Sequence, residues 1–220
     1  MKRIMMISLV IVLLVSMVPA ALAQYDVSLK GDYWFWSGDF AGISVDGGAF
    51  VLGATCSVWD NIDLEYKGIF GNVSTIFGYP LDGSGLAIKP VTNIFKLNYW
   101  LGPNLYVNLG YADKVINIVV PDTTIGLLGF KGFRFGIGGE YSFYNGWKVF
   151  GDFGVAPCNV SLLNITMSNT SGTMTDLQLG LSYEISQDLS FRGGYMYQNT
   201  TVEDLESTIG GLFFGASYEL

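Results

Sequence analysis

The residues of this chain that could do chemistry are almost all carboxylates and amines. The 220 residues include 19 acids, 11 lysines and arginines, two cysteines and no histidine. The lack of histidine excludes hydrolases that need an imidazole base and most zinc and haem sites. No pair of carboxylates has a spacing that suggests acid–base catalysis, so we expect neither an enzyme nor a cofactor.

One acidic cluster is a weak candidate for a metal site, because divalent cations prefer several carboxylate oxygens. It consists of Glu203, Asp204 and Glu206. The cluster lacks the regular spacing and the glycine of a calcium loop, so we interpret it as a solvated acidic segment and expect no metal.

Most of the other charges belong to segments in which apolar and polar residues alternate. In 131–143, for example, Phe133, Phe135 and Ile137 fall in one phase, whereas Arg134 and Glu140 fall in the other. A strand places alternate side chains on opposite faces, so each such segment would have one apolar and one polar face. We expect ten strands, with eight as the alternative, near 25–36, 48–59, 62–74, 91–101, 105–117, 131–143, 147–157, 174–185, 189–199 and 208–220.

The connections between these strands alternate between short and long. The short ones have good turn chemistry and lie at 60–61, 102–104, 144–146 and 186–188. The long ones, at about 37–47, 75–90, 118–130, 158–173 and 200–207, are rich in Gly, Pro, Ser, Thr, Asn and Asp. This alternation predicts an all-β fold, an antiparallel up-and-down transmembrane β-barrel with short periplasmic turns and longer outer loops.

Charge separates the two faces of the strands. Because a lysine or arginine facing lipid at the bilayer midplane costs about 2–4 kcal/mol, the charged phase must face the lumen. That phase holds sixteen charged residues, which we predict to form a lumen-lining network: Asp26, Lys30, Asp32, Asp63, Glu65, Lys67, Lys96, Lys114, Arg134, Glu140, Lys148, Asp152, Asp176, Glu184, Arg192 and Glu219.

Aromatic side chains of the apolar phase gather at both ends of the strands, as expected for girdles at two membrane interfaces. Toward the short turns or the C-terminus lie Tyr99, Tyr141, Phe143, Trp147, Tyr183 and Tyr218. Toward the long connections lie Tyr33, Phe35, Phe70, Tyr111, Phe133 and Tyr197. With this threading, Cys56 and Cys158 fall at opposite rims, which is too far apart for disulfide geometry.

The N-terminus has the three parts of a secretory signal peptide. Lys2 and Arg3 are followed by an apolar run and by the small-x-small sequence Ala21-Leu22-Ala23. We expect cleavage after Ala23, with residues 24–220 forming one barrel domain. The mature chain would keep nine bases against 19 acids, and this acidity argues against nucleic acid as a partner.

The signal peptide, the alternating glycine-rich and aromatic strands and the closing pattern Leu212-x-Phe214-x-Ala216-x-Tyr218-x-Leu220 resemble the small outer-membrane β-barrel proteins of Gram-negative bacteria. These are porin-like barrels such as the OmpX- and OmpW-like proteins. The resemblance implies export to the outer membrane, contact with its lipid and lipopolysaccharide, and insertion by the barrel-assembly machinery. The last strand is similar to the signal read by that machinery, although the usual final Phe or Trp is replaced by Leu220.

The predicted lumen permits two functions. Charged residues of both signs can pair and fill the bore, because barrels of about eight strands hold only side chains and open porins need about 16 strands. Bulky inward residues would add to the filling: Trp34, Trp36, Tyr106, Phe150, Met196 and Phe213. We therefore expect a structural, adhesive or envelope-stabilising barrel that displays surface loops, and the alternative is a narrow channel for cations or small solutes.

Overall fold

A computed structural model of the chain describes residues 26–40, 42–81, 87–120, 123–162, 165–203 and 205–220. The signal peptide predicted for residues 1–23 lies outside these residues and stays a prediction. Within them, no helix is long and apolar enough to span a membrane. Ten long strands and one two-residue strand make up the structure: β1 (Val27–Phe40), β2 (Ile43–Trp59), β3 (Ile62–Ile76), β4 (Tyr79–Pro80), β5 (Ala87–Gly102), β6 (Leu105–Val120), β7 (Thr123–Tyr144), β8 (Trp147–Leu162), β9 (Ile165–Glu184), β10 (Leu189–Val202) and β11 (Leu205–Glu219).

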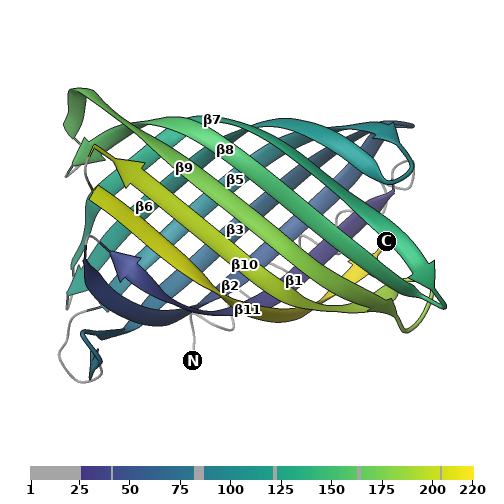
Figure 1. Ribbon diagram of the computed structural model, residues 1–220, viewed down its shortest axis with the longest axis horizontal. Helices are drawn as coiled ribbons and strands as arrows, with labels where there is room; N and C mark the ends of the chain where they lie inside the picture. Colours follow the sequence, from purple (N-terminus) through teal and green to yellow (C-terminus); the bar gives the residue numbers. More distant parts are fainter. Residues whose placement is uncertain (1–25, 41, 82–86, 121–122, 163–164, 204) are drawn as a thin grey trace.

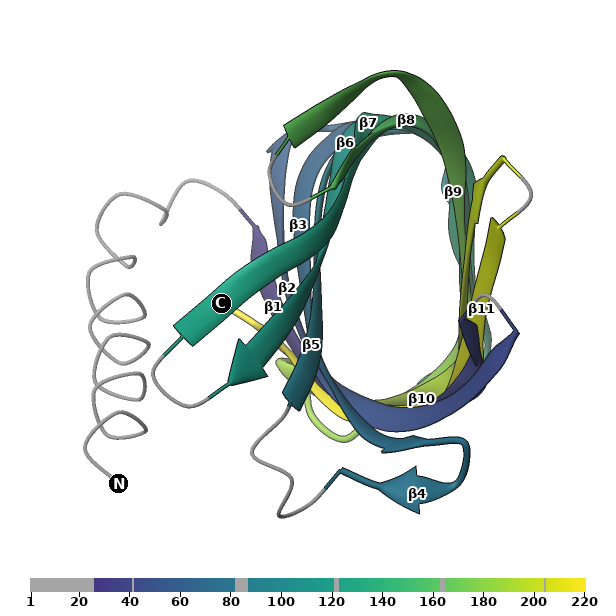
Figure 2. The ribbon, with the colours of Figure 1, turned by 90° about the vertical axis from the view of Figure 1, so that its left-hand side faces the viewer.

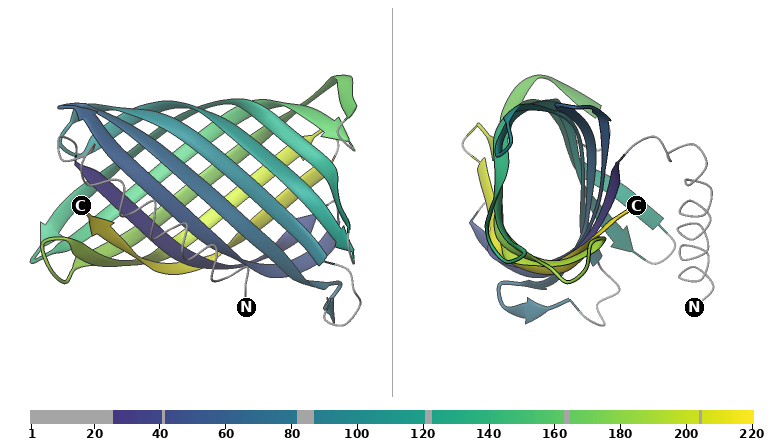
Figure 3. Two further views of the ribbon diagram at one scale, coloured as in Figure 1. Left: turned by 180° about the vertical axis from the view of Figure 1, so that it is seen from behind. Right: turned by 90° about the vertical axis from the view of Figure 1, so that its right-hand side faces the viewer.

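The ten long strands form one closed antiparallel barrel (Figures 1 and 2). Each pairs with its neighbours in the chain, β4 adds only a short edge to β3, and β1 pairs with β11 to close the ring. The strands are strongly tilted relative to the barrel axis, as closing a sheet into a barrel requires (Figures 1 and 3). The prediction of ten strands is confirmed, and the alternative of eight is wrong.

The four short turns lie where the sequence predicts them, at the end of the barrel that also holds the C-terminus (Figure 1). Asn145 and Gly146, which join β7 to β8, have φ values of 31° and 83°. Positive φ at both central positions is typical of a type I′ hairpin turn, and Asn-Gly is its preferred sequence. We call this the turn end of the barrel, and the opposite end the hairpin end.

The long connections are much shorter than predicted, and most of the residues assigned to them are strand. β7 has 22 residues and β9 has 20, and β1 and β2 leave only residues 41–42 between them. The reason is physical. Lipid imposes alternation on a strand only inside the membrane, whereas the backbone hydrogen bonds of the ladder continue into water. Segments without alternation therefore look like loops in the sequence, although the barrel wall continues through them as hairpins (Figure 2).

The outer face of the wall is apolar. Large side chains from around the ring are exposed there, among them Leu52, Phe95, Phe135, Leu179 and Phe214. Both predicted aromatic bands lie on this face, except that Tyr197 is half-buried. An exposed apolar surface that runs around a closed sheet is stable in lipid and not in water, so this wall spans a membrane.

Candidate functional site: the interior of the barrel

Arg134 is the centre of an ion network in the barrel interior. Its side chain is fully buried, and the guanidinium donates two hydrogen bonds of 2.8 Å to the carboxylate of Asp176 on β9. It also bonds Asp152 on β8 and Asn108 on β6. Because β7 carries Arg134, four adjacent strands are tied together at one level of the bore.

Lys96 extends this network toward β3. Its ammonium group lies 3.2 Å from Glu65 Oε1 and 3.1 Å from Asp152 Oδ2. Asp152 also accepts hydrogen bonds from Tyr106 and Asn108, at 2.9 and 3.2 Å. Two cations and three carboxylates thus share one buried cluster, in which every charge has a partner of opposite sign, as buried charges require.

Two further bonds cross the bore. Lys67 on β3 donates to Gln178 Oε1 on β9 over 2.8 Å, and Lys114 on β6 donates to Thr200 Oγ1 on β10 over 3.1 Å. β3 and β9 lie five places apart in the ring of ten, and β6 and β10 lie four places apart. These bonds therefore join opposite walls of the barrel directly, at two levels of the interior.

Toward the hairpin end the interior is mostly apolar, although the buried Lys114–Thr200 bond lies there as well. Two clusters of buried side chains face each other there, and Phe40 and Ile88 pack against both of them. One is formed mainly by β1, β2, β3, β10 and β11: Trp34, Trp36, Val45, Ala49, Val51, Ile69, Val73, Met196, Ile209 and Phe213. The other is formed by β5 to β9: Ile94, Ala112, Ile116, Phe130, Ala156, Cys158, Val160 and Met174. The interior is therefore ionic toward the turn end and mainly apolar toward the hairpin end.

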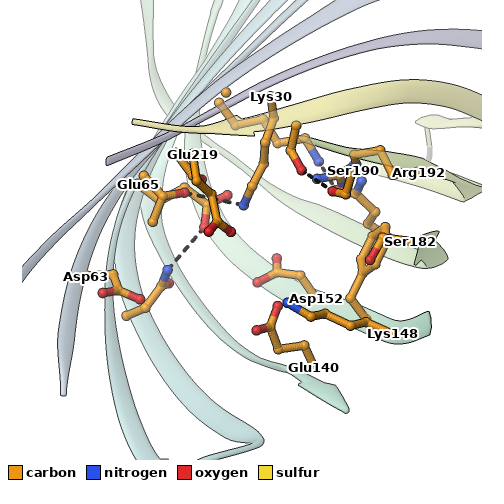
Figure 4. Close-up of a pocket in the computed structure, with 18 of the residues that line it drawn as sticks. Lys30, Asp63, Glu65, Glu140, Lys148, Asp152, Ser182, Ser190, Arg192 and Glu219 are labelled. Carbon is orange, nitrogen blue, oxygen red and sulfur yellow. Dashed lines mark hydrogen bonds between the residues drawn. The ribbon is translucent and has the colours of Figure 1, made fainter. Parts of the chain in front are cut away.

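Toward the turn end the interior opens into a cavity of about 500 Å³, which we call the vestibule (Figure 4). Lys30, Glu65, Asp152 and Arg192 line it, and Glu140 and Glu219 lie nearer the ends of their strands. Arg192 lies 3.1 Å from Asp32 and packs over the ring of Phe150, 4.5 Å from its centroid. The vestibule ends where Lys67 meets Gln178 and where the Arg134 network begins.

The structure brings most of the sixteen predicted lumen charges to this vestibule. Twelve of them line it: Asp26, Lys30, Asp32, Asp63, Glu65, Lys67, Lys96, Glu140, Lys148, Asp152, Arg192 and Glu219. Arg134 and Asp176 lie deeper in the ion network, and Lys114 lies beside the apolar core. Glu184 is half-exposed at the rim, 2.6 Å from Lys148.

Sequence reasoning missed the neutral polar residues that complete the network. Asn98 donates to Glu65 over 3.1 Å, Asn108 bonds Arg134, and Gln178 and Thr200 accept the two bonds that cross the bore. All four are buried and share the inward phase of their strands. The period-two pattern could have placed them inside, but it could not have paired them, because their partners lie on distant strands.

The weak metal candidate finds little support. Glu206 accepts a hydrogen bond of 2.8 Å from Asn199, Glu203 is exposed, and Asp204 lies outside the described residues. No group of three His, Cys, Asp or Glu side chains in the described part of the chain could hold a metal ion. Cys56 and Cys158 are both free, near the turn end and the hairpin end respectively.

No family model and no curated protein matches this sequence. Among solved structures, the outer membrane protease OmpT of Escherichia coli is 13% identical over 89% of this chain and 96% of its own, with a TM-score of 0.48. Neisserial surface protein A and the attachment invasion locus protein Ail of Yersinia pestis are 9% and 11% identical. Both similarities cover 89% of this chain and have a TM-score of 0.43. They cover 97% of Neisserial surface protein A and 98% of Ail.

The chain's own geometry establishes its class without those similarities. Its ring of antiparallel strands is closed, its outer face is apolar with aromatic residues near both ends, and its charges lie inside. In a lipid bilayer only such a closed sheet satisfies every backbone group of a β-structure. The protein is a membrane-spanning β-barrel of ten strands.

Proposed function

We propose that this protein is a non-enzymatic, closed barrel that serves as a rigid scaffold in the bacterial outer membrane. In this role it displays its protruding hairpins on the outer side and contributes structural, adhesive or envelope-stabilising work. The observation that carries the proposal is the pair of hydrogen bonds between opposite walls, Lys67–Gln178 and Lys114–Thr200.

The two halves of the interior support closure by different means. In the ionic half, opening a path for ions would require separating buried charges from their partners, which is costly because each would be left buried without a counter-charge. In the apolar half, Trp34 and Phe213 are buried almost completely, and bulky apolar side chains of this kind offer no ligands to a passing ion.

The hairpin end offers the surface for display. Phe77 and Tyr79 are exposed beyond the end of β3, and the turn between them contains Gly78 with a φ of 76°. Exposed aromatic residues on a rigid hairpin are suited to binding a partner, because they contribute a large contact area at low conformational cost. Under this proposal, the outer face of the wall meets outer-membrane lipid and lipopolysaccharide, and the β11 strand ending at Leu220 is read by the assembly machinery.

Single-channel recording in planar bilayers tests the closed barrel. We expect no conductance steps from protein whose folded state is verified by its faster migration on gels before boiling. A variant with Lys67→Ala, Gln178→Ala, Arg134→Ala and Asp176→Ala removes one of the two bonds that cross the bore and a balanced part of the network. Combined with Lys114→Ala, which removes the other crossing bond, it serves as the positive control. Steps from the unaltered protein would contradict the proposal.

A narrow cation channel is the second candidate, because acids outnumber bases in the vestibule. Its lining includes eight acids, Asp26, Asp32, Asp63, Glu65, Glu140, Asp152, Asp188 and Glu219, and five bases, Lys30, Lys67, Lys96, Lys148 and Arg192. A negative lining concentrates cations at a pore mouth. Stable, cation-selective steps from the unaltered protein would favour this function.

A further inference from the structure

A row of polar groups crosses five adjacent strands in one wall of the vestibule. The register pairs Ser190 with Ser217, Ser217 with Lys30, Lys30 with Gly53 and Gly53 with Lys67. All five residues line the cavity. Because neighbouring strands lie about 4.8 Å apart, the two lysines flank Gly53 at a backbone separation of roughly 10 Å.

Neither lysine of this row forms a salt bridge within the described part of the chain. Lys30 donates only to Thr55 Oγ1, at 3.3 Å, and Lys67 only to Gln178 Oε1, at 2.8 Å. Every other cation that lines the vestibule has a carboxylate within 3.2 Å: Lys96, Lys148 and Arg192. Lys30 and Lys67 are therefore the cations of this cavity that keep their capacity to bind an anionic group.

Gly53 places no side chain between the two lysines, and the stem of Lys30 lies over it. A Cβ atom built on Gly53 would meet Lys30 Cβ at 3.4 Å and Lys30 Cδ at 3.8 Å, so the larger side chain of a β-branched residue would displace Lys30. Within hydrogen-bond distance of Lys67 lies the amide of Gln178, which is 92% buried and whose Nε2 donor has no partner. A buried donor without a partner is costly, which is a second and independent indication of a missing acceptor.

On the same wall, carboxylates lie closer to the mouth of the vestibule. Glu219 is two residues beyond Ser217 on β11, and therefore about 7 Å nearer the turn end. Its side chain is exposed and projects into the opening of the vestibule (Figure 4). Because acids outnumber bases in the lining as a whole, a singly charged carboxylate is favoured over a doubly charged phosphate, and a cationic group on the same solute would be attracted to the mouth.

We infer that the vestibule binds a small zwitterionic solute, with its carboxylate between Lys30 and Lys67 above Gly53 and its ammonium group near Glu219. The unpartnered Nε2 of Gln178 completes the carboxylate site. The solute enters from the compartment that the turn end faces. This inference goes beyond the proposed scaffold function, and its test requires no conductance, so its failure would leave the closed bore untouched.

Three probes of one length test the inference. They are 5-aminovalerate, which carries both charges, valerate, which carries only the anion, and pentylamine, which carries only the cation. Isothermal titration calorimetry on the barrel folded in a nonionic detergent gives the dissociation constant of each. We expect 5-aminovalerate to bind at least about tenfold more tightly than either singly charged probe.

Substitutions locate the site. Lys30→Met and Lys67→Met together, and Gly53→Val separately, should each weaken binding of 5-aminovalerate by about tenfold or more. Lys148→Met is the matched control, because Lys148 lines the same cavity but is paired with Glu184. It should leave the dissociation constant unchanged. Gel migration before and after boiling verifies that each variant is folded.

Four results would overturn the inference. They are no binding of 5-aminovalerate, equal binding of valerate, equal binding of pentylamine, or an equal loss of binding in Lys148→Met. The second and third would identify a general anion or cation site, and the fourth would identify a diffuse electrostatic effect of the vestibule.

Discussion

Lys67 and Gln178 stand on opposite walls of the barrel, 111 residues apart in the sequence, and their side chains meet in a hydrogen bond of 2.8 Å. The cross-section of the barrel is oval and not round, so two opposite walls come close together (Figure 2). Flattening brings β3 and β9 within reach of one lysine and one glutamine. Both residues line the vestibule, so the same contact supports both the proposed closed bore and the proposed solute site.

The assignment of the two faces predicts a strong asymmetry along β2. Leu52→Arg places a charge on the exposed apolar face and should destabilise the inserted barrel by about 2–4 kcal/mol, because the arginine would have to enter lipid. Ser57→Arg is the control on the same strand, since Ser57 lines the vestibule and bonds Asp63. Folding yield in lipid vesicles, read from gel migration without boiling, measures the difference. A larger loss for Ser57→Arg would mean that inside and outside are reversed, and equal yields would contradict the predicted asymmetry.

The Arg134 network predicts a charge-compensation effect. Arg134→Met leaves Asp176 without its ion-pair partner and should lower the free energy of unfolding by about 3–5 kcal/mol. Adding Asp176→Asn should restore most of that loss, because Asp152 keeps Lys96 as its partner. Urea unfolding in vesicles, followed by tryptophan fluorescence, measures both variants. If the double variant were no more stable than Arg134→Met, charge pairing would not be what stabilises this level of the bore.

Gly154 makes room for Arg134. A Cβ atom at this position would lie 2.1 Å from the guanidinium carbon, and Arg134 has no exposed surface into which it could move. Gly154→Ala should therefore cost about 1–3 kcal/mol, as overpacking of a core does. Gly31→Ala is the matched control, because no atom lies within 4 Å of its added methyl group. The same urea unfolding experiment compares the two, and indistinguishable stabilities would show that Arg134 can relocate.

Orientation in the membrane can be read from epitope tags. Gly42 is exposed at the hairpin end with a φ of 84°, and an insertion after it should be tolerated and bound by antibody on intact cells. An insertion between Asn145 and Gly146 at the turn end should be bound only after the outer membrane is permeabilised. Flow cytometry on intact and permeabilised cells gives the result, and the reverse pattern would place the hairpin end in the periplasm.

The sequence by itself determined the number of strands, the short turns and the side of the wall on which each residue lies. This was possible because lipid enforces a period of two, so that the charge of Arg134 or the bulk of Phe135 already decides which way each side chain points. The same signal disappears where strands leave the membrane. For that reason the parts of β7 and β9 near the hairpin end could not be distinguished from loops.

Only the tertiary structure decided what the inward side chains do. The period-two alternation places four side chains inside the barrel, those of Lys67, Gln178, Arg134 and Asp176. The tilt and register of the closed ring determine which of them meet. The division of the interior into an ionic half and an apolar core, and the row that runs from Ser190 through Gly53 to Lys67, also depend on contacts between strands far apart in the chain. Local alternation carries no information about such contacts, because they arise when the first and last strands pair and bring opposite walls face to face.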